Sequence, residues 1–472
     1  MNLFVRKPIS RIVDESQDGE HSLKKTLGPK SLIALGIGAI IGAGLFSLTG
    51  IAAAENAGPA VTISFMVAAV GCAFAGMCYS ELASMIPVAG SAYTYTYATM
   101  GEFIAWIIGW DLVLEYAVAS AVVAVSWSRY VLSFLGDFGI HLPHPLTSCP
   151  FDPVPGIINV PAVIIIIGIS LLLIAGIKES ANVNAVIVVI KMAVVLTFIC
   201  VGLHYIKMSN YHPFIPPNTG TFGEFGMSGV MRAAGIIFFA YIGFDSVSTA
   251  AQESRKPSRD IPIGILGSLA ICTVLYLAFS FVLTGMVNYK DMRGDAAPVA
   301  TAINLTPYPW LQMLIKFGII GGFTSVILVM LLGQSRVFYS MSRDGLLPKV
   351  FSDIHPKFKT PWKSNLLIMV LVGLCAGLLP ISQLGHMTSI GTLMAFIIVC
   401  AGVIVLRATK PNVPRPYRSP FVPLFPILGI LVCFSMMYSL NRETWLRLVV
   451  WLAIGLVVYF TYSRHHSRLN QK

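Results

Sequence analysis

The sequence predicts an all-α polytopic membrane protein, in which about twelve transmembrane helices form a five-plus-five inverted repeat followed by two further helices. The first observation is composition, because 56% of the 472 residues are hydrophobic and only 11% are charged, whereas soluble domains contain about 25% charged residues. The second is that apolar stretches of about 20 residues, long enough to cross a bilayer core, recur along the whole chain. The third is that two of these stretches, five spans apart, are interrupted by glycine or by an acid, which is typical of inverted repeats with discontinuous helices.

Hydropathy gives approximate limits for each predicted span. These limits are 30–52, 59–85, 101–134, 157–177, 182–206, 227–251, 262–287, 309–341, 364–380, 386–407, 421–440 and 444–463. The chain then divides into a cytoplasmic N-terminal tail, a first repeat of helices 1–5, a second repeat of helices 6–10, two final helices and a cytoplasmic C-terminal tail. The corresponding ranges are 1–29, 30–206, 227–407, 421–463 and 464–472.

The net charge of +11 is unevenly distributed over this topology. Lysine and arginine gather in the segments on the side of both termini and are rare in the opposite loops. This bias predicts a multi-pass protein of the cell membrane with both termini in the cytoplasm, and it accounts for the basic charge without nucleic acid. Trp106 and Trp110 lie near a predicted span end, so we expect them at the membrane interface. The eight cysteines form no CxxC motif and no Cys/His cluster, so we expect no metal site.

The most informative stretch is the run Gly36-Ile-Gly-Ala-Ile-Ile-Gly-Ala-Gly44 in the first span. Glycine lowers helix stability, and unwound backbone at membrane depth survives only where protein or a wet cavity satisfies it. Span six carries the matching interruption, Phe238-Phe-Ala-Tyr-Ile-Gly-Phe-Asp245. We therefore predict that helices 1 and 6 are both discontinuous and that their breaks form a binding site for a small polar solute.

Several motifs resemble the cationic amino acid transporter family of the amino acid–polyamine–organocation superfamily, and in particular its bacterial members. These motifs are Leu23-Lys-Lys-Thr-Leu-Gly28, the Gly36–Gly42 run, Cys78-Tyr-Ser-Glu-Leu82, Pro87-Val-Ala-Gly-Ser-Ala-Tyr-Thr-Tyr95, Gly109-Trp-Asp-Leu-Val-Leu-Glu-Tyr116, Phe239–Asp245 and Arg343-Asp-Gly-Leu-Leu-Pro348. The resemblance covers about residues 23–465. It implies the inverted-repeat fold and secondary active transport of amino acids, with the carboxylate of the substrate at the unwound part of span one and its amino group at span six.

The residues at the two breaks suit a zwitterion. We expect the N–H groups of Gly42, Ala43 and Gly44 to hold the carboxylate, because a half-helix amino terminus attracts an anion. We expect the ammonium group to meet freed carbonyls of other residues at the breaks, namely Ile40, Ile41, Phe239, Ala240 and Ile242. The alternative is that the glycines serve helix packing, since Gly38 and Gly42 make a GxxxG pair. At Ala43 many members of the family carry serine or threonine, so this chain must rely on backbone donors alone.

The resemblance also assigns a gate to Phe239, whose ring would close the site from outside; the alternative is a packing side chain. The surroundings of the breaks are apolar, with Ile40, Ile41, Phe239, Ile242 and Ser325 as candidates for the side-chain pocket. A cationic side chain would need an acid there. We therefore predict neutral, mostly aliphatic or small substrates, despite the name of the family.

Lys191 lies in the middle of span five, where burying a charged side chain is energetically costly. A charged residue at such a position usually serves a function. Sodium-coupled relatives of the fold hold a cation between spans one, five and eight, and the Lys191 ammonium could replace it. We therefore assign proton coupling to Lys191 and Glu115, with no sodium and no other cofactor. Asp111 and Glu115 are four residues apart and share a helix face, and the alternative for Glu115 is a structural pair with a basic residue. Arg343 and Asp344, at the end of span eight, read as gate or anchor residues.

These observations predict a permease that imports neutral L-amino acids by proton symport and alternating access. An exchanger or a carrier of cationic amino acids is the alternative within transport, and a receptor or channel is the alternative outside it. An enzyme is excluded, since the chain has no HExxH, GxSxG or GxxxxGK[ST] motif. The expected partners are the L-amino acid and the lipid bilayer, and the sequence leaves open whether a small membrane accessory subunit binds.

Overall fold

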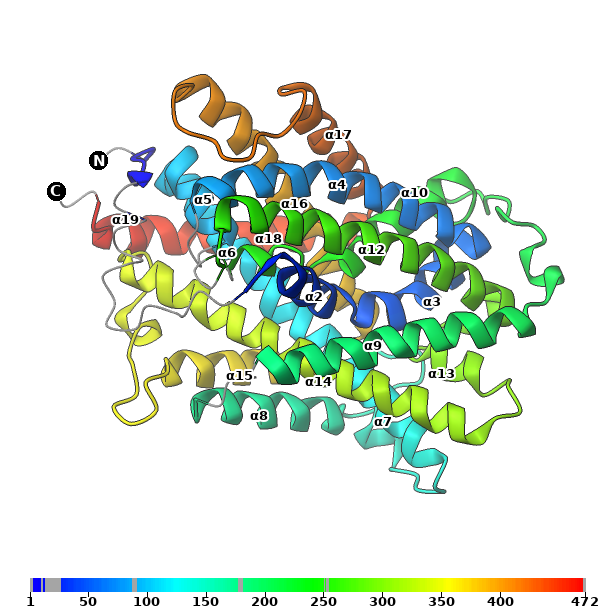
Figure 1. Ribbon diagram of the computed structural model, residues 1–472. Coiled ribbons are helices and arrows are strands. Elements are labelled where there is room, and N and C mark those ends of the chain that lie inside the picture. The colour runs from blue at the N-terminus through cyan, green and yellow to red at the C-terminus, as the bar shows by residue number, and fades with distance from the viewer. Residues whose placement is uncertain are drawn as a thin grey trace.

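The computed structural model describes residues 3–9, 12, 27–86, 91–176, 181–249, 251 and 254–469. Within these residues the protein is helical, and its only β-type pairing is an isolated bridge between Leu27 and Ser254. The helices run roughly side by side along one long direction (Figure 1). The motif residues 23–26 and 87–90 lie outside the described residues.

The first half of the chain is built mainly from long helices with short π or 3-10 segments between them. In order they are α2 (Pro29–Ile40), η1 (Gly44–Leu48), α3 (Thr49–Ala52), η2 (Ala53–Ala57), η3 (Gly58–Ala60), α4 (Val61–Met85), α5 (Ser91–Thr99), α6 (Glu102–Val113), η4 (Leu114–Val118), α7 (Ala119–Gly136), α8 (Val160–Ile174) and α9 (Ala181–Gly202).

The second half of the chain is also built mainly from long helices with short π or 3-10 segments between them. Its elements are α10 (Gly226–Ile237), η8 (Phe238–Tyr241), α11 (Ser246–Thr249), α12 (Pro257–Met286), η10 (Tyr289–Met292), α13 (Pro298–Ile303), α14 (Pro309–Arg343), η11 (Lys349–Phe351), α15 (Trp362–Leu378), α16 (Ile381–Thr409), α17 (Leu424–Ser439), α18 (Arg442–Val458), η12 (Tyr459–Ser463) and α19 (Arg464–His466).

Among the described residues, eight helical segments are long and apolar enough to cross a membrane, and four shorter apolar helices accompany them. The shorter ones are Pro29–Ile40, Val160–Ile174, Trp362–Leu378 and Leu424–Ser439. The chain is therefore a multi-pass helical membrane protein. The count of twelve spans, the inverted repeat and the division into segments remain predictions.

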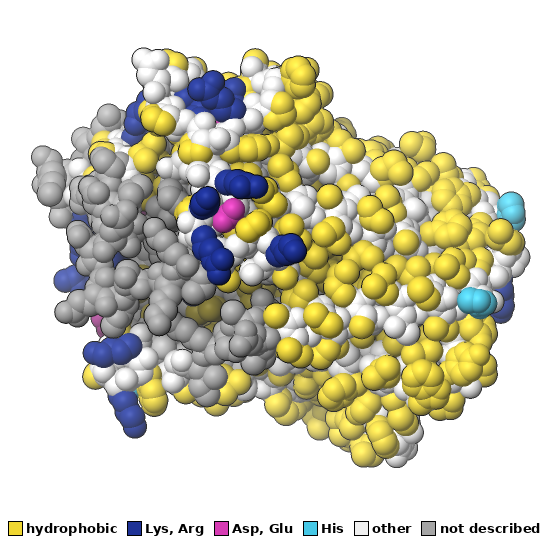
Figure 2. All heavy atoms as spheres, in the orientation of Figure 1, with side chains coloured by type: hydrophobic (Ala, Val, Ile, Leu, Met, Phe, Trp, Pro, Cys, Tyr) yellow, Lys and Arg dark blue, Asp and Glu magenta, His cyan; other side chains and the backbone are white. Residues whose placement is uncertain are grey.

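The outer surface is that of a protein in lipid. Large apolar side chains stand out from it, among them Val189 at 67%, Val274 at 68% and Phe317 at 65% exposure. Figure 2 shows this apolar surface over most of the visible face, with most of the visible lysine and arginine side chains at one end. Residues 3–9 and α19 lie together at one end of the bundle, because Ser467 and Val5 both bond to Glu102.

Trp106 does not face the lipid as an exposed interfacial tryptophan would. Its side chain is completely buried, and its Nε1 donates to the carbonyl of Gly455 in α18 at 3.0 Å. Trp110 stacks between Trp106 and Trp451. A Cβ on Gly455 would lie 2.5 Å from Trp110 Cδ1, so the bare backbone of Gly455 lets α6 and α18 pack closely enough to enclose Trp106.

Candidate functional site

The first span is broken at Ile41 and Gly42. Helix α2 ends at Ile40, Ile41 has an extended backbone (φ −72°, ψ 105°), and η1 begins at Gly44. The break is narrower than predicted, because Gly36 and Gly38 remain inside α2. A Cβ on Gly36 would lie 2.4 Å from Ser268 Oγ, so the packing alternative is correct for Gly36.

The break leaves backbone donors unpaired. Within the described part of the chain, the N–H groups of Gly42, Ala43 and Gly44 find no hydrogen-bond acceptor. All three residues are buried, and buried N–H groups without a partner are rare in proteins. They stand at the amino terminus of the η1 segment, where the backbone dipole favours an anion.

The second break lies in span six and touches the first. Helix α10 ends at Ile237, the 3-10 turn η8 follows, Ile242 is extended, and α11 begins at Ser246. Gly243 has a φ of +115°, and a Cβ there would lie 2.7 Å from the carbonyl oxygen of Ala39. A Cβ on Gly44 would lie 2.3 Å from Ala240 Cα. Glycine on each side therefore allows the two unwound segments to meet backbone to backbone.

Tyr276 of α12 joins the carbonyl sides of the two breaks. Its hydroxyl lies 2.9 Å from the oxygen of Ile40 and 3.0 Å from the oxygen of Ala240, and it donates its single proton between them. Two of the carbonyls that we expected to meet an ammonium group are thus in contact with this hydroxyl. The carbonyl of Phe239 accepts from the N–H of Ile242 at 3.1 Å. Of the five predicted acceptors, Ile41 and Ile242 have no donor among the described residues.

Lys191 of α9 lies between α2 and α14. Its Nζ donates to the carbonyl of Gly38, one turn before the first break, at 2.7 Å. Its stem packs against Gly322 of α14, where a Cβ would lie 3.1 Å from Lys191 Cε. Lys191 as a whole is buried, at 1% exposure. Lys191 therefore contacts the elements of spans one and eight, and its role in coupling stays a prediction.

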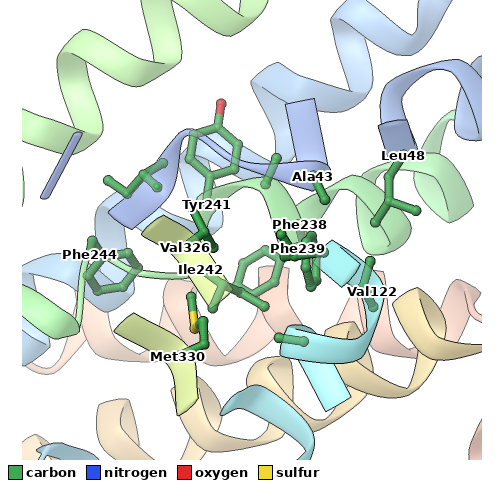
Figure 3. Packing of buried hydrophobic residues seen from close by; sticks show 14 of the residues in the cluster. Ala43, Leu48, Val122, Phe238, Phe239, Tyr241, Ile242, Phe244, Val326 and Met330 are labelled. Atoms are coloured by element: carbon green, nitrogen blue, oxygen red, sulfur yellow. The ribbon is translucent and has the colours of Figure 1, made fainter. Parts of the chain in front are cut away.

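The side chains around the breaks are apolar. Figure 3 shows Ala43, Phe239, Ile242, Val326 and Met330 on the segments that surround them. Gly42 also faces Val326, since a Cβ there would lie 3.5 Å from Val326 Cγ2. Phe239 is 6% exposed and Ser325 donates its hydroxyl to the carbonyl of Gly322 at 3.0 Å. These side chains offer contact surface to an aliphatic side chain and carry no charge themselves.

An acidic group lies beside the second break. Asp111 of α6 and Glu115 of η4 are both 1% exposed, and neither carboxylate has a hydrogen-bond partner among the described residues. Glu115 lies close enough to Asp111 and Asp245 for their charges to interact. The basic partner that we considered for Glu115 is therefore not found in the described part of the chain. Asp245 accepts a hydrogen bond from the hydroxyl of Tyr116.

A groove of about 320 Å³ between α9 and α14 is a poor candidate for a zwitterion. Its lining is apolar except for Thr197 and includes Ile190, Phe317 and Gly321. Apart from the Thr197 hydroxyl, it offers no partner for a carboxylate or an ammonium group. The described residues also include no group of three His, Cys, Asp or Glu side chains that could hold a metal ion.

Comparison with known proteins decides the family. A family model described as amino acid permease matches residues 27–460. The chain belongs to the amino acid permease family. The permease is 46% identical to the branched-chain amino acid permease BcaP of Bacillus subtilis, over 100% of this chain and 99% of that protein. It is 44% identical to the methylthioribose transporter of the same organism, over 100% of both chains.

More distant relatives agree with this assignment. The permease is 31% identical to the vacuolar cationic amino acid transporter 4 of Arabidopsis thaliana, over 100% of this chain and 97% of that protein. The resemblance to the cationic amino acid transporters is thereby confirmed. The protein is an amino acid permease and not an enzyme.

The sequence did not identify three parts of this site. Tyr276 was missed, although a tyrosine hydroxyl in the middle of an apolar span needs a hydrogen-bond partner. The partnership of Tyr116 with Asp245 was missed because the two lie 129 residues apart. Gly322 gave no signal at all, since its importance comes only from the Lys191 stem that passes over it.

Proposed function

We propose that the permease imports neutral L-amino acids into the cytoplasm by proton symport, through alternating access across the cell membrane, with both termini inside. The observation that carries this proposal is the row of unpaired N–H groups at Gly42, Ala43 and Gly44. A carboxylate would satisfy all three in one step. The carbonyls of Ile41 and Ile242, on the two facing breaks, would accept from the ammonium group.

The apolar lining supports a neutral side chain as the rest of the substrate. Ile242, Val326 and Met330 are at most 4% exposed and carry no charge. A guanidinium or ammonium side chain would be desolvated there without a partner, which costs several kcal/mol. The relative named as a branched-chain amino acid permease supports the same substrate class. Phe239 would act as the gate that closes over the bound substrate.

Ligand stabilisation of the purified permease tests this substrate class. Leucine, isoleucine and valine should raise the melting temperature in a concentration-dependent way, because a ligand that binds only the folded state stabilises it. Arginine and lysine should have little effect. Leucinamide, which lacks the carboxylate, should bind much more weakly than leucine. Methylthioribose belongs in the same screen, and stabilisation by it without stabilisation by leucine would overturn the proposed substrate.

Lys191 supports the coupling part of the proposal. An ammonium group on the carbonyl of Gly38 would fix the first break while protonated, and loss of the proton would release it. Glu115 would take part as a second buried proton acceptor near the second break. Substrate binding and protonation of Lys191 would then favour the same position of α2.

Uptake of labelled leucine into proteoliposomes tests the coupling. Wild-type uptake should follow an imposed pH gradient and be independent of sodium. Lys191→Met should abolish gradient-driven uptake, and Glu115→Gln should reduce it, while Lys316→Gln removes another buried lysine of the bundle away from the breaks and serves as the matched control. Uptake that needs sodium, or full gradient-driven uptake by Lys191→Met, would contradict the coupling.

A further inference from the structure

The two ends of the described chain dock on the same part of the permease. Residues 3–7 run along the turn between α5 and α6, where Phe103 N donates to Leu3 O at 3.0 Å, Glu102 N to Val5 O at 3.0 Å and Lys7 N to Tyr97 O at 3.2 Å. Gly101 in this turn has a φ of +101°, and a Cβ there would lie 2.7 Å from the backbone of Phe4. The turn is thus shaped to carry the N-terminal segment.

Asp344, which follows the last residue of α14, gathers contacts from three other segments. Its Oδ1 accepts from Lys7 Nζ at 2.8 Å and its Oδ2 accepts from the Tyr93 hydroxyl of α5 at 2.8 Å. Its carbonyl accepts from the backbone N–H of Arg468 at 3.1 Å. Lys7 is 8% exposed, so water screens this ion pair far less than one on the open surface.

The Tyr93 hydroxyl is a stable hydrogen-bond donor to Asp344. Burial, together with the charge of Asp344, raises the pKa of the Tyr93 phenol well above its ordinary value. The hydroxyl therefore keeps its proton, and its hydrogen bond to Asp344, throughout the neutral and moderately alkaline range.

The C-terminal segment closes the arrangement from the other side. Glu102 accepts from the hydroxyls of Tyr97 at 2.8 Å and Tyr459 at 3.3 Å, and also from the hydroxyl of Ser467. Gly345 has a φ of +87°, and a Cβ there would lie 2.2 Å from the carbonyl oxygen of His466. Two buried or half-buried carboxylates, Glu102 and Asp344, therefore bind both terminal segments to α5, α6 and α14.

We propose that these two terminal segments form a clasp that holds this end of the permease closed, with the Lys7–Asp344 ion pair as its latch. Asp344 joins α14 of the predicted second repeat to α5 of the predicted first repeat. For the substrate to leave at this end, between the two repeats, α5 and α14 would have to separate. That separation would break the hydrogen bond between Tyr93 and Asp344. The inference rests on the proposed alternating access for its meaning in transport, whereas the clasp itself is a property of the folded protein.

Hydrogen–deuterium exchange on the purified permease tests the latch without any transport. Lys7→Gln should speed exchange of the Glu102 and Phe103 amides by about tenfold or more, because a hydrogen bond to a charged group is lost. The amide of Phe225, bonded to Asn56 O at 2.8 Å away from the clasp, should be unchanged. Lys349→Gln removes an exposed lysine that follows α14 and has no ion pair among the described residues, and it should behave like the wild type.

Further variants keep the test decisive. Lys7→Arg retains the charge and should restore slow exchange, and the exchange of charges in Lys7→Asp with Asp344→Lys should restore it in part. Slow exchange in Lys7→Gln, or equal acceleration in Lys349→Gln, would overturn the clasp. Leucine stabilisation measured on the same samples reports the proposed function separately, so that either idea can fail while the other stands.

Discussion

The two breaks face each other, but they are held in different ways. The first break is fixed by donors from three other helices, namely Lys191 on Gly38 O, Tyr276 on Ile40 O and Tyr130 on Phe46 O. All three bonds use carbonyls of the first span and none uses its N–H groups. The second break is tied by the same Tyr276 at Ala240 O and by the Asp245–Tyr116 contact.

This difference explains how unwound backbone can be both rigid and available. A break that was held through its N–H groups would have no donors left for a ligand. Since its carbonyls carry the ties instead, the first break stays in place while Gly42, Ala43 and Gly44 keep their donors. The second break contributes the opposite chemistry, because the carbonyl of Ile242 has no donor among the described residues.

The contact between the two breaks gives the largest expected effect. Gly44→Ala would place a Cβ 2.3 Å from the Ala240 backbone, which no side-chain rotation relieves. We expect loss of leucine binding and a destabilisation of about 1–3 kcal/mol, as for other overpacked sites. Gly373→Ala in α15, away from both breaks, is the matched control, because its Cβ would make only ordinary contact with Val163 at 3.9 Å. Binding assays on both variants check this, and wild-type affinity in Gly44→Ala would disprove the close approach.

The shared tyrosine gives an intermediate effect. Tyr276→Phe leaves the carbonyls of Ile40 and Ala240 without their donor, at a cost of about 1–3 kcal/mol for buried unsatisfied groups. We expect leucine affinity to fall by roughly tenfold while the protein stays folded. Tyr211→Phe is the control. It removes a hydroxyl that donates at 2.7 Å to the carbonyl of Phe281, which lies on the same helix as Tyr276. Equal losses in both variants would mean that Tyr276 supports only the fold.

Ala43 gives the smallest effect, and one of opposite sign. Ala43→Ser adds a hydroxyl beside the N–H donors, and a net hydrogen bond of about 1 kcal/mol should tighten leucine binding roughly fivefold. Ala43→Val adds volume without a donor and should not tighten binding. Titration calorimetry on the two variants distinguishes them. Weaker binding in Ala43→Ser would place the carboxylate elsewhere.

The sequence predicted the positions of the breaks better than their extent. A glycine run marks a weak helix, but it does not say which glycines unwind. Gly36 stays in α2, where Ser268 occupies the space of its missing side chain, and the chain unwinds only from Ile41, in the later part of the predicted run. Lys191 was predictable because a lysine in mid-membrane needs a partner.

Contacts between distant segments escaped prediction. Tyr276 reaches Ile40 across 236 residues, and nothing local to either residue announces the pair. Glu115 lies in a π-helical segment, so the four-residue spacing to Asp111 did not define its surroundings. The burial of Trp106 escaped prediction for the same reason, because its hydrogen-bond acceptor, the carbonyl of Gly455, lies on another helix.

A structure of the permease with bound leucine tests the central claim most directly. The account predicts that the leucine carboxylate lies within about 2.7–3.2 Å of the backbone nitrogens at Gly42–Gly44. The ammonium group should point at the carbonyls of Ile41 and Ile242, with the side chain toward Val326 and Met330. A carboxylate bound to a basic side chain, or leucine bound away from both breaks, would contradict it.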